Sequence, residues 1–151
     1  MRISDVMTKT VTCVSPETPA LDAARIMLNA KVSGLPVTDH QGRVLGMLSE
    51  SDLMRSLPLK DTGLLAGLLS FLIGNTSAAD LIGASNKPVG EMMCHPPIVI
   101  RDDQPLQDAL TLMQHHHVKR LPVIRDGKLV GLLARHDLLR AAVDLVESTA
   151  V

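Results

Sequence analysis

Arg120-Leu121-Pro122-Val123, in the second half of the chain, repeats the pattern of Gly34-Leu35-Pro36-Val37 in the first half. Each stretch precedes a glycine-led segment, Gly46-Met47-Leu48-Ser49-Glu50-Ser51-Asp52 in one half and Gly131-Leu132-Leu133-Ala134-Arg135-His136-Asp137 in the other. Residues 5–56 align with residues 91–141 at an offset of 86, which falls to 85 after one deletion. Identities that keep their order over this length indicate an internal duplication.

Each copy predicts a strand and then a helix at its start. The extended runs are Val11–Val14 in the first copy and Ile98–Ile100 in the second. A proline follows each run, Pro19 or Pro105, and suits the first position of a helix because an N–H has no helical partner there. In the second copy, apolar residues then recur at helical spacing, at Leu106, Ala109, Leu110 and Met113.

Two strands and a second helix complete each copy. A turn that contains Gly42 or Gly127 joins the two strands as a hairpin. The second helix is expected to begin near Ser49 or Ala134. The expected strands are Leu35–Thr38, Arg43–Leu48, Leu121–Ile124 and Lys128–Leu133. The order is therefore β-α-β-β-α, twice.

The predicted fold class is α/β, with two repeats packed by pseudo-twofold symmetry into one module. One repeat of about fifty residues is too small to cover both faces of its sheet. Packing the two together would leave clefts between them for a small ligand. The predicted divisions are repeat 1 at 1–57, an insertion at 58–87 and repeat 2 at 88–148. We expect Leu35, Val37, Leu121 and Val123 to be buried.

Composition narrows the function classes. The formal net charge of −1 gives no field that would attract nucleic acid or an anionic membrane, and Phe71 is the single aromatic residue. Cys13 and Cys94 lack metal-ligand spacing, so reduced thiols and a cytoplasmic location are expected, with a disulfide as the alternative. The apolar run Gly63–Gly74 is too short for a membrane span. We interpret it as a helix docked on the core or on a partner subunit, or as a membrane-surface anchor with only Lys60 nearby.

The duplicated motifs resemble the paired cystathionine-β-synthase (CBS) domain, also called a Bateman module. The two glycine-led segments and the lead-in sequences Asp5-Val6-Met7-Thr8 and Glu91-Met92-Met93-Cys94 carry this resemblance. The resemblance implies a module that often dimerises. It also implies binding of AMP, ADP, ATP or S-adenosylmethionine between the repeats, and signalling of occupancy to an effector protein. It covers nearly the whole chain except the central insertion.

The resemblance places the ribose and phosphate edge of the ligand on Ser49 and Asp52, with Met47 beside the base. A carboxylate can accept hydrogen bonds from both ribose hydroxyls, and a helix N-terminus favours phosphate. The alternative is that Ser49 and Asp52 form a capping box that needs no ligand. The two roles can coexist. The expected residues of this first cleft are Thr12, Met47, Ser49, Asp52, Lys119, Arg120, Leu121 and Pro122.

Lys119 and Arg120 stand where the first copy has Ser33 and Gly34. The resemblance implies that residues before this proline reach the other repeat's cleft, where the two cations would pair with phosphate. Alternatively, they are solvated surface charges. The second copy departs from the pattern because Ala134 replaces the hydroxyl, although Asp137 remains and Arg135 could contact phosphate. The possible second cleft comprises Gly34, Leu35, Pro36, Ile98, Arg135 and Asp137.

Enzymatic and metal-binding functions find little support in the sequence. His115, His116 and His117 are consecutive, and helical side chains about 100° apart do not converge on one ion. No nucleotide-hydrolase, dinucleotide or nucleophile-elbow motif is present. The leading interpretation is a non-catalytic homodimeric sensor that needs no cofactor and binds an adenosine-type regulatory ligand. The alternative is a ligand-free dimerising scaffold. A transcriptional regulator would need a basic face or helix-turn-helix that the sequence does not show.

Overall fold

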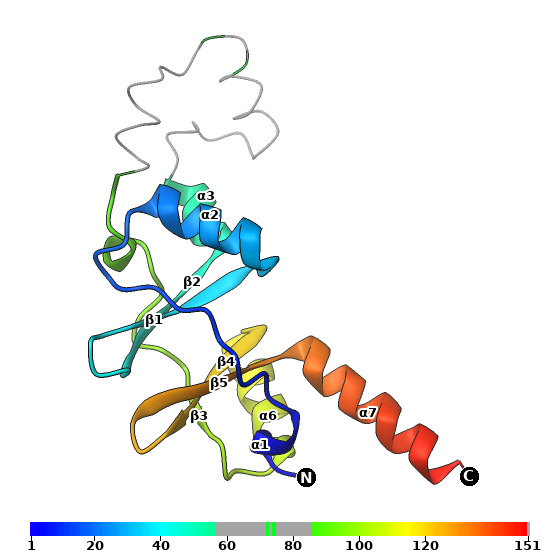
Figure 1. Ribbon diagram of the computed structural model, residues 1–151. Helices are drawn as coiled ribbons and strands as arrows, with labels where there is room; N and C mark the ends of the chain where they lie inside the picture. The colour runs from blue at the N-terminus through cyan, green and yellow to red at the C-terminus, as the bar shows by residue number, and fades with distance from the viewer. Residues whose placement is uncertain (57–71, 73, 75–85, 151) are drawn as a thin grey trace. The chain divides into compact units, whose positions relative to one another are not determined.

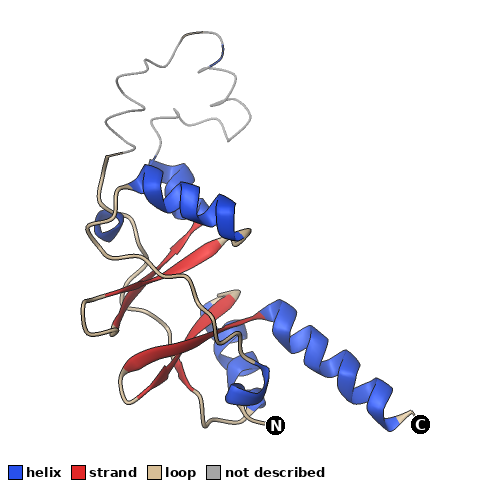
Figure 2. Cartoon of the chain, viewed as in Figure 1, coloured by secondary structure: helices blue, strands red, loops and turns tan. Residues whose placement is uncertain are grey.

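The computed structural model describes residues 1–56, 72, 74 and 86–150 (Figure 1). In the first half it contains α1 (Ile3–Val6), α2 (Ala20–Ala30), β1 (Gly34–Thr38), β2 (Val44–Ser49) and α3 (Glu50–Ser56). The second half begins with a 3-10 turn at Val89–Glu91 and continues with β3 (Ile100–Arg101), α6 (Leu106–His116), β4 (Arg120–Arg125), β5 (Lys128–Ala134) and α7 (Arg135–Thr149). The fold is mixed α/β, as the sequence predicted (Figure 2). The apolar run predicted as a docked helix lies, apart from Leu72 and Gly74, outside the described residues.

The chain forms two compact units, and neither is continuous in sequence. The C-terminal unit comprises Met1–Thr12, Thr38–Val44 and Pro96–Val151, and the central unit comprises Cys13–Val37 and Leu45–His95. Each unit therefore combines most of one repeat with the N-terminal lead-in segment of the other, which is 1–12 in the C-terminal unit and 88–95 in the central unit. The hairpin turn of the first repeat, Thr38–Val44, also falls in the C-terminal unit. The predicted divisions at 1–57, 58–87 and 88–148 follow the sequence repeats and stay a prediction about those repeats.

Backbone hydrogen bonds fix each lead-in segment on its unit. In the C-terminal unit, Thr8 and Leu132 exchange two bonds, with N···O distances of 2.9 and 3.0 Å. In the central unit, Cys94 and Met47 exchange the equivalent pair at 2.9 and 3.0 Å. The lead-in turns are also matched, because Ile3 N–H donates to Gln104 O at 3.0 Å in the same way that Val89 N–H donates to Thr18 O at 2.9 Å. Each lead-in segment is thus held on the other repeat by equivalent hydrogen bonds, as expected from the internal duplication. We call this reciprocal docking the exchange of lead-in segments.

The C-terminal unit contains a three-stranded sheet in the order β3-β4-β5. β3 runs parallel to β4, pairing Ile100 with Val123, and β4 and β5 form an antiparallel hairpin. Asp126 and Gly127 close this hairpin with φ angles of +52° and +78°. Two consecutive positive φ angles are typical of a type I′ turn, which matches the right-handed twist of paired strands. The predicted turn at Gly127 is confirmed.

The central unit contains a two-stranded sheet, β1-β2, and its expected third strand is reduced to one bridge. The predicted run Val11–Val14 contributes a parallel bridge between Val14 and Val37. At the equivalent place in the other unit, Asp102 N–H donates to Ile124 O at 3.2 Å and extends the ladder. Position 16, which corresponds to Asp102, is Pro16 and has no N–H to donate. Pro16 therefore ends the pairing after Val14. Of the two predicted runs, only Val14 pairs in Val11–Val14 and only Ile100 belongs to a strand in Ile98–Ile100, so both predictions are wrong for the earlier residues.

Each unit has its own apolar core, and the two cores use equivalent residues. The core of the C-terminal unit consists of Ile3, Ile100, Ala109, Met113, Leu121, Val123 and Leu133. The core of the central unit consists of Val14, Ala23, Met27, Leu35, Val37, Leu48 and Val89. The burial predicted for Leu35, Val37, Leu121 and Val123 is confirmed, since all four are fully buried. Of the predicted apolar stripe on α6, Ala109 and Met113 are buried, whereas Leu110 is half exposed.

Candidate functional site

Ser49 and Asp52 lie at the junction between β2 and α3 in the central unit. Asp52 Oδ2 accepts the Ser49 N–H at 2.8 Å, and Asp52 N–H donates to Ser49 Oγ at 3.2 Å. These reciprocal bonds form a capping box that satisfies N–H groups at the start of the helix. The capping role predicted as the alternative is confirmed, and it fixes the Asp52 side chain at the end of the strand.

Two further groups contact the Asp52 carboxylate, and sequence reasoning identified neither. Arg55, one turn further along α3, pairs its Nη2 with Asp52 Oδ1. The Cys94 thiol donates to Oδ1 at 3.6 Å from the exchanged lead-in segment. The spacing of Arg55 three residues after Asp52 is a usable signal for a helical ion pair. Nothing in the sequence signals Cys94, because its approach depends on the exchange.

The Asp52 site is buried and electrostatically asymmetric. Asp52 is 2% exposed, whereas the Arg55 side chain is 67% exposed. Cys94 is exposed as a residue, but partial desolvation of its sulfur raises the pKa of the thiol, and the charge and hydrogen bond of Asp52 raise it further. A thiol with a raised pKa stays neutral at pH 7 and acts as a hydrogen-bond donor to the carboxylate. The site therefore presents a buried acceptor with an exposed cation on its solvent side.

The equivalent site in the C-terminal unit is built differently. Asp137 Oδ2 accepts the Ala134 N–H at 2.8 Å at the start of α7, but Ala134 has no hydroxyl to complete a capping box. Arg140, the counterpart of Arg55, places Nη2 at 2.9 Å from His136 Nε2 instead of pairing with Asp137. Asp137 and Arg140 also line a pocket of about 190 Å³ between α1 and α7, together with Met1, Asp5, Val6, Ala141 and Asp144.

The remaining predicted residues differ in how accessible they are. Leu121 and Pro122 on β4, and Gly34, Leu35 and Pro36 on β1, are buried. Lys119, Thr12 and Arg135 are exposed, while Arg120, Met47 and Ile98 are half-buried. Lys119 contributes its carbonyl oxygen to the Arg135 N–H at 3.1 Å.

The two units divide the predicted ligand residues between them. The central unit carries Met47, Ser49, Asp52, Gly34, Leu35 and Pro36, and the C-terminal unit carries Thr12, Ile98, Lys119, Arg120, Leu121, Pro122, Arg135 and Asp137. The structure thus brings Ser49, Asp52 and Met47 into one unit. The assembly of each cleft from both units stays a prediction.

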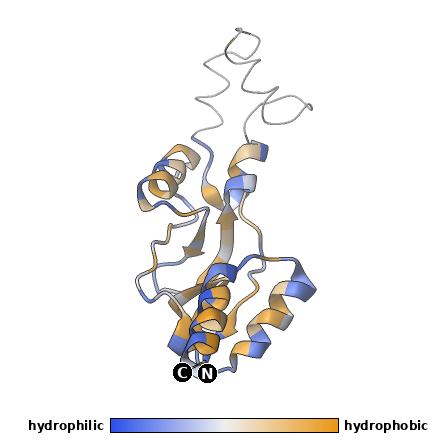
Figure 3. Ribbon diagram, turned by 90° about the vertical axis from the view of Figure 1, so that its right-hand side faces the viewer, coloured by the Kyte–Doolittle hydropathy of each residue, from blue (hydrophilic) through white to orange (hydrophobic). Residues whose placement is uncertain are grey.

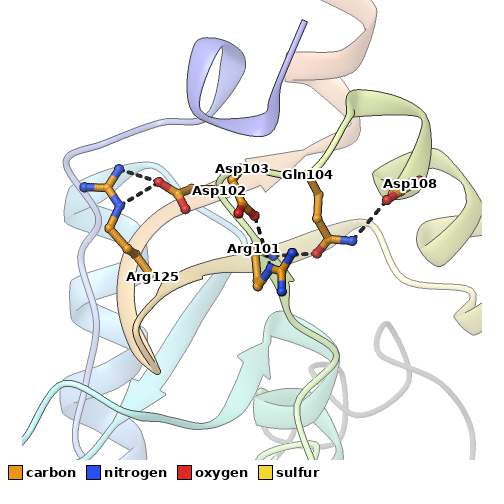
Figure 4. A network of polar contacts seen from close by, with 6 residues as sticks. All are labelled: Arg101, Asp102, Asp103, Gln104, Asp108 and Arg125. Carbon is orange, nitrogen blue, oxygen red and sulfur yellow. Dashed lines mark hydrogen bonds and ion pairs between the residues drawn. The ribbon is translucent and has the colours of Figure 1, made fainter.

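Sequence reasoning missed a group of polar contacts around Asp102 (Figure 4). Asp102 is buried and accepts a hydrogen bond from Arg125 Nε at 2.7 Å, and Arg125 Nη2 contacts the same oxygen. The hydrogen bond to Asp102, and then its charge, raise the pKa of Arg125. The Asp102 carbonyl oxygen accepts the Ser4 N–H at 3.0 Å. Arg125 therefore anchors the side chain of the residue whose carbonyl oxygen accepts the Ser4 N–H.

The histidine run ends the helix α6. His117 is the C-cap residue, in the left-handed region with φ +54°. Among the residues that the structure describes, no group of three His, Cys, Asp or Glu side chains is arranged to hold a metal ion. Within the same described ranges, no helix has the length and apolar character needed to cross a membrane.

The duplicated sequence, the paired units and the equivalent Ser49/Asp52 and Ala134/Asp137 junctions define a tandem module. The model of the CBS domain family matches residues 3–59 and 89–144. The chain belongs to the CBS domain family and carries two CBS domains. The family resemblance seen in the sequence is therefore confirmed.

Particular relatives extend this assignment. The chloroplastic CBS domain-containing protein CBSX2 of Arabidopsis thaliana is 33% identical over 156 residues, which cover 97% of this chain and 66% of CBSX2. The chain thus spans just under two thirds of that relative. The uncharacterised protein MJ1426 of Methanocaldococcus jannaschii is 31% identical over 155 residues, covering 95% of this chain and 92% of MJ1426. The crystal structure of CBSX2 in complex with AMP matches with a TM-score of 0.73 at 33% identity, covering 95% of this chain and 97% of that one.

Proposed function

We propose that this protein is a non-catalytic regulatory module that binds an adenosine-type ligand and passes its occupancy to a partner protein. The observation that carries the proposal is the match to CBSX2, a relative of 33% identity whose structure was solved with AMP. The chain keeps a hydroxyl and a carboxylate, Ser49 and Asp52, at the start of α3. Both are groups that recognise ribose hydroxyls. AMP, ADP, ATP and S-adenosylmethionine are the candidate regulatory ligands.

We place the stronger site at Ser49 and Asp52. The other residues that we propose for this site are Thr12, Met47, Lys119, Arg120, Leu121 and Pro122. Lys119 is exposed, which supports a role in contacting a phosphate. The weaker site contains Asp137, where Ala134 supplies no hydroxyl. Its proposed complement is Gly34, Leu35, Pro36, Ile98 and Arg135.

The proposed assembly is a homodimer. The α7 helix leaves Leu139, Val143 and Val146 exposed, at 64%, 47% and 67%. These positions recur at a spacing of four and then three residues, so they share one helical face. Apolar residues lie along this helix beside its polar residues (Figure 3). A stripe of this kind on a surface helix favours a protein contact.

We also propose a reducing compartment such as the cytoplasm. Cys13 and Cys94 are both exposed and are not joined by a disulfide. Thiols that stay reduced are typical of cytosolic proteins. CBSX2 itself is a chloroplastic protein.

A ligand-free dimerising scaffold is the second candidate. The observation that favours it is that Ser49, Arg55 and Cys94 satisfy most of the hydrogen-bonding capacity of the Asp52 carboxylate. In this case the capping box serves the fold alone, and α7 provides the functional surface.

Thermal-shift measurements with AMP, ADP, ATP and S-adenosylmethionine distinguish the two candidates. A ligand present at one hundred times its dissociation constant stabilises the folded chain by about 2.7 kcal/mol. Titration calorimetry then gives the stoichiometry, for which one strong site per chain is expected. If none of the four compounds raises the melting temperature or gives binding heat, the scaffold candidate replaces the sensor.

A further inference from the structure

The Asp52 carboxylate already has a cationic partner in the structure. The Oδ2 atom accepts the Ser49 N–H at 2.8 Å, and the Oδ1 atom contacts both Arg55 Nη2 and the Cys94 thiol. A carboxylate has about four acceptor positions, so these contacts occupy most of them. About one position is left, so a ribose that binds this carboxylate through both of its hydroxyls must displace one of these contacts. Ser49 N–H belongs to the helix cap, and Cys94, whose main chain is held by its bonds to Met47, contributes only a neutral thiol 3.6 Å from Oδ1. Arg55 is the partner that can leave.

The exposure of Arg55 makes its departure feasible. Its side chain is 67% exposed, while the Asp52 side chain is 1% exposed. The guanidinium thus approaches a buried carboxylate from the solvent side. An arginine in this position can turn away without disturbing the core, because few atoms pack around it.

The second repeat shows the same arginine in another arrangement. Arg140 occupies the position equivalent to Arg55 at the offset of 85, three residues after Asp137. It contacts His136 Nε2 at 2.9 Å instead of Asp137. The position equivalent to His136 in the first repeat is Ser51, whose short side chain offers no comparable partner. The two repeats therefore differ in the neighbour that is available to this arginine.

We propose that Arg55 makes the first site selective for phosphorylated adenosine ligands by exchanging Asp52 for the ligand's phosphate. The inference rests on the proposed function. Ribose hydroxyls take the Asp52 oxygens, and the released guanidinium needs a new anion. A phosphate supplies it through charge-assisted hydrogen bonds that suit the arginine fork. Unphosphorylated adenosine supplies none, so its binding bears the whole cost of breaking the Arg55–Asp52 pair.

Calorimetric titration of the full chain with AMP and with adenosine tests this exchange. In Arg55→Gln, adenosine should bind several-fold more tightly and AMP equally or less tightly, because the internal competitor and the phosphate partner are both removed. The ratio of the two dissociation constants should fall about tenfold, the value of one charge-assisted contact. Arg55→Lys should retain part of the preference. Arg140→Gln is the matched control and should leave the ratio at the strong site unchanged.

Several results would contradict the proposed release of Arg55 from Asp52. An unchanged ratio in Arg55→Gln, with both constants moving together, would show that Arg55 only supports the fold and would overturn the exchange. Weaker adenosine binding in Arg55→Gln would also overturn it. If the wild-type chain binds neither compound nor any other adenosine ligand, the proposed function fails, and this inference fails with it.

A measurement on the wild-type chain does not depend on how well the variants fold. The ¹⁵N resonance of Arg55 Nε, assigned by its loss in Arg55→Lys, reports the partner of the guanidinium. Saturating AMP should shift this resonance to that of a phosphate-bonded guanidinium, while saturating adenosine should shift it to that of a solvated one. A resonance that moves with neither ligand would mean that Arg55 remains on Asp52, and the exchange would be wrong.

Discussion

Replacing Gly46 with alanine should destabilise the protein more than replacing its counterpart Gly131. A Cβ atom at Gly46 would lie 2.6 Å from Met93 Sδ and 2.7 Å from the Cys94 carbonyl oxygen. At Gly131, the nearest atom is the Sδ of Met7, and the Thr8 carbonyl oxygen lies 3.0 Å away. The first clash involves fixed backbone, and the second involves mainly the end of a flexible side chain.

The magnitudes follow from what must move. At Gly46, the Cys94 carbonyl has to withdraw by about 0.6 Å to reach an ordinary C···O separation of roughly 3.3 Å. That carbonyl accepts the Met47 N–H at 3.0 Å, so its movement weakens the bonds that hold the exchanged lead-in segment. Overpacking of about 1–3 kcal/mol and a lost hydrogen bond of about 1 kcal/mol exceed the alanine's entropic gain of about 0.4–1 kcal/mol. We expect a net loss of roughly 2–3 kcal/mol for Gly46→Ala and roughly 1 kcal/mol for Gly131→Ala.

Urea denaturation followed by circular dichroism measures both losses, and second substitutions separate their causes. Adding Met7→Ala to Gly131→Ala should give a favourable coupling energy, because the clashing sulfur is removed. Adding Met93→Ala to Gly46→Ala should recover little, since the carbonyl oxygen remains. Equal losses at Gly46 and Gly131, or full recovery by Met93→Ala, would refute the argument that the fixed backbone decides the difference.

Three further changes test other parts of the structure. Asp52→Ala should abolish the strong adenosine-ligand site in calorimetry, since a lost charge-assisted hydrogen bond is worth roughly 1.5–3 kcal/mol. Asp137→Ala should leave the affinity of that site within about twofold. The opposite result would place the strong site at Asp137. The pKa of Cys94 is raised by burial and by Asp52, so Asp52→Asn should lower it and speed alkylation of Cys94 at pH 8, measured by peptide mass spectrometry. Because folding raises the pKa of Cys94, the stability that its neutral thiol contributes is fully present at neutral pH and is lost as the pH rises above 9.0, the ordinary pKa of a cysteine thiol. An unchanged alkylation rate in Asp52→Asn would contradict the contact between Cys94 and Asp52. Leu139→Asp with Val146→Asp on α7 should convert a homodimer to a 16.2 kDa monomer in sedimentation, and a wild-type chain that is already monomeric at micromolar concentration would reject the dimer.

The sequence determined the elements and the family because both depend on local pattern. The short apolar runs Leu121–Ile124 and Leu129–Leu133, joined by a turn that contains Gly127, specify the β4–β5 hairpin from neighbouring residues alone. The alignment of the two halves places Leu35 and Leu121 at equivalent positions, so the sequence predicted that both are buried. The spacing of Ser49 and Asp52 likewise contained the capping box, since its two hydrogen bonds span three residues.

Only the tertiary structure decided how distant segments pair. Each lead-in segment docks on the body of the other repeat, and no local pattern distinguishes this from docking on its own repeat. The approach of Cys94 to Asp52 spans 42 residues and follows from that exchange. Equivalent arginines also chose different partners, Asp52 for Arg55 and His136 for Arg140. The physical reason is that local spacing specifies hydrogen bonds within one element, whereas the pairing of segments about 40 to 125 residues apart is settled only when the whole chain packs.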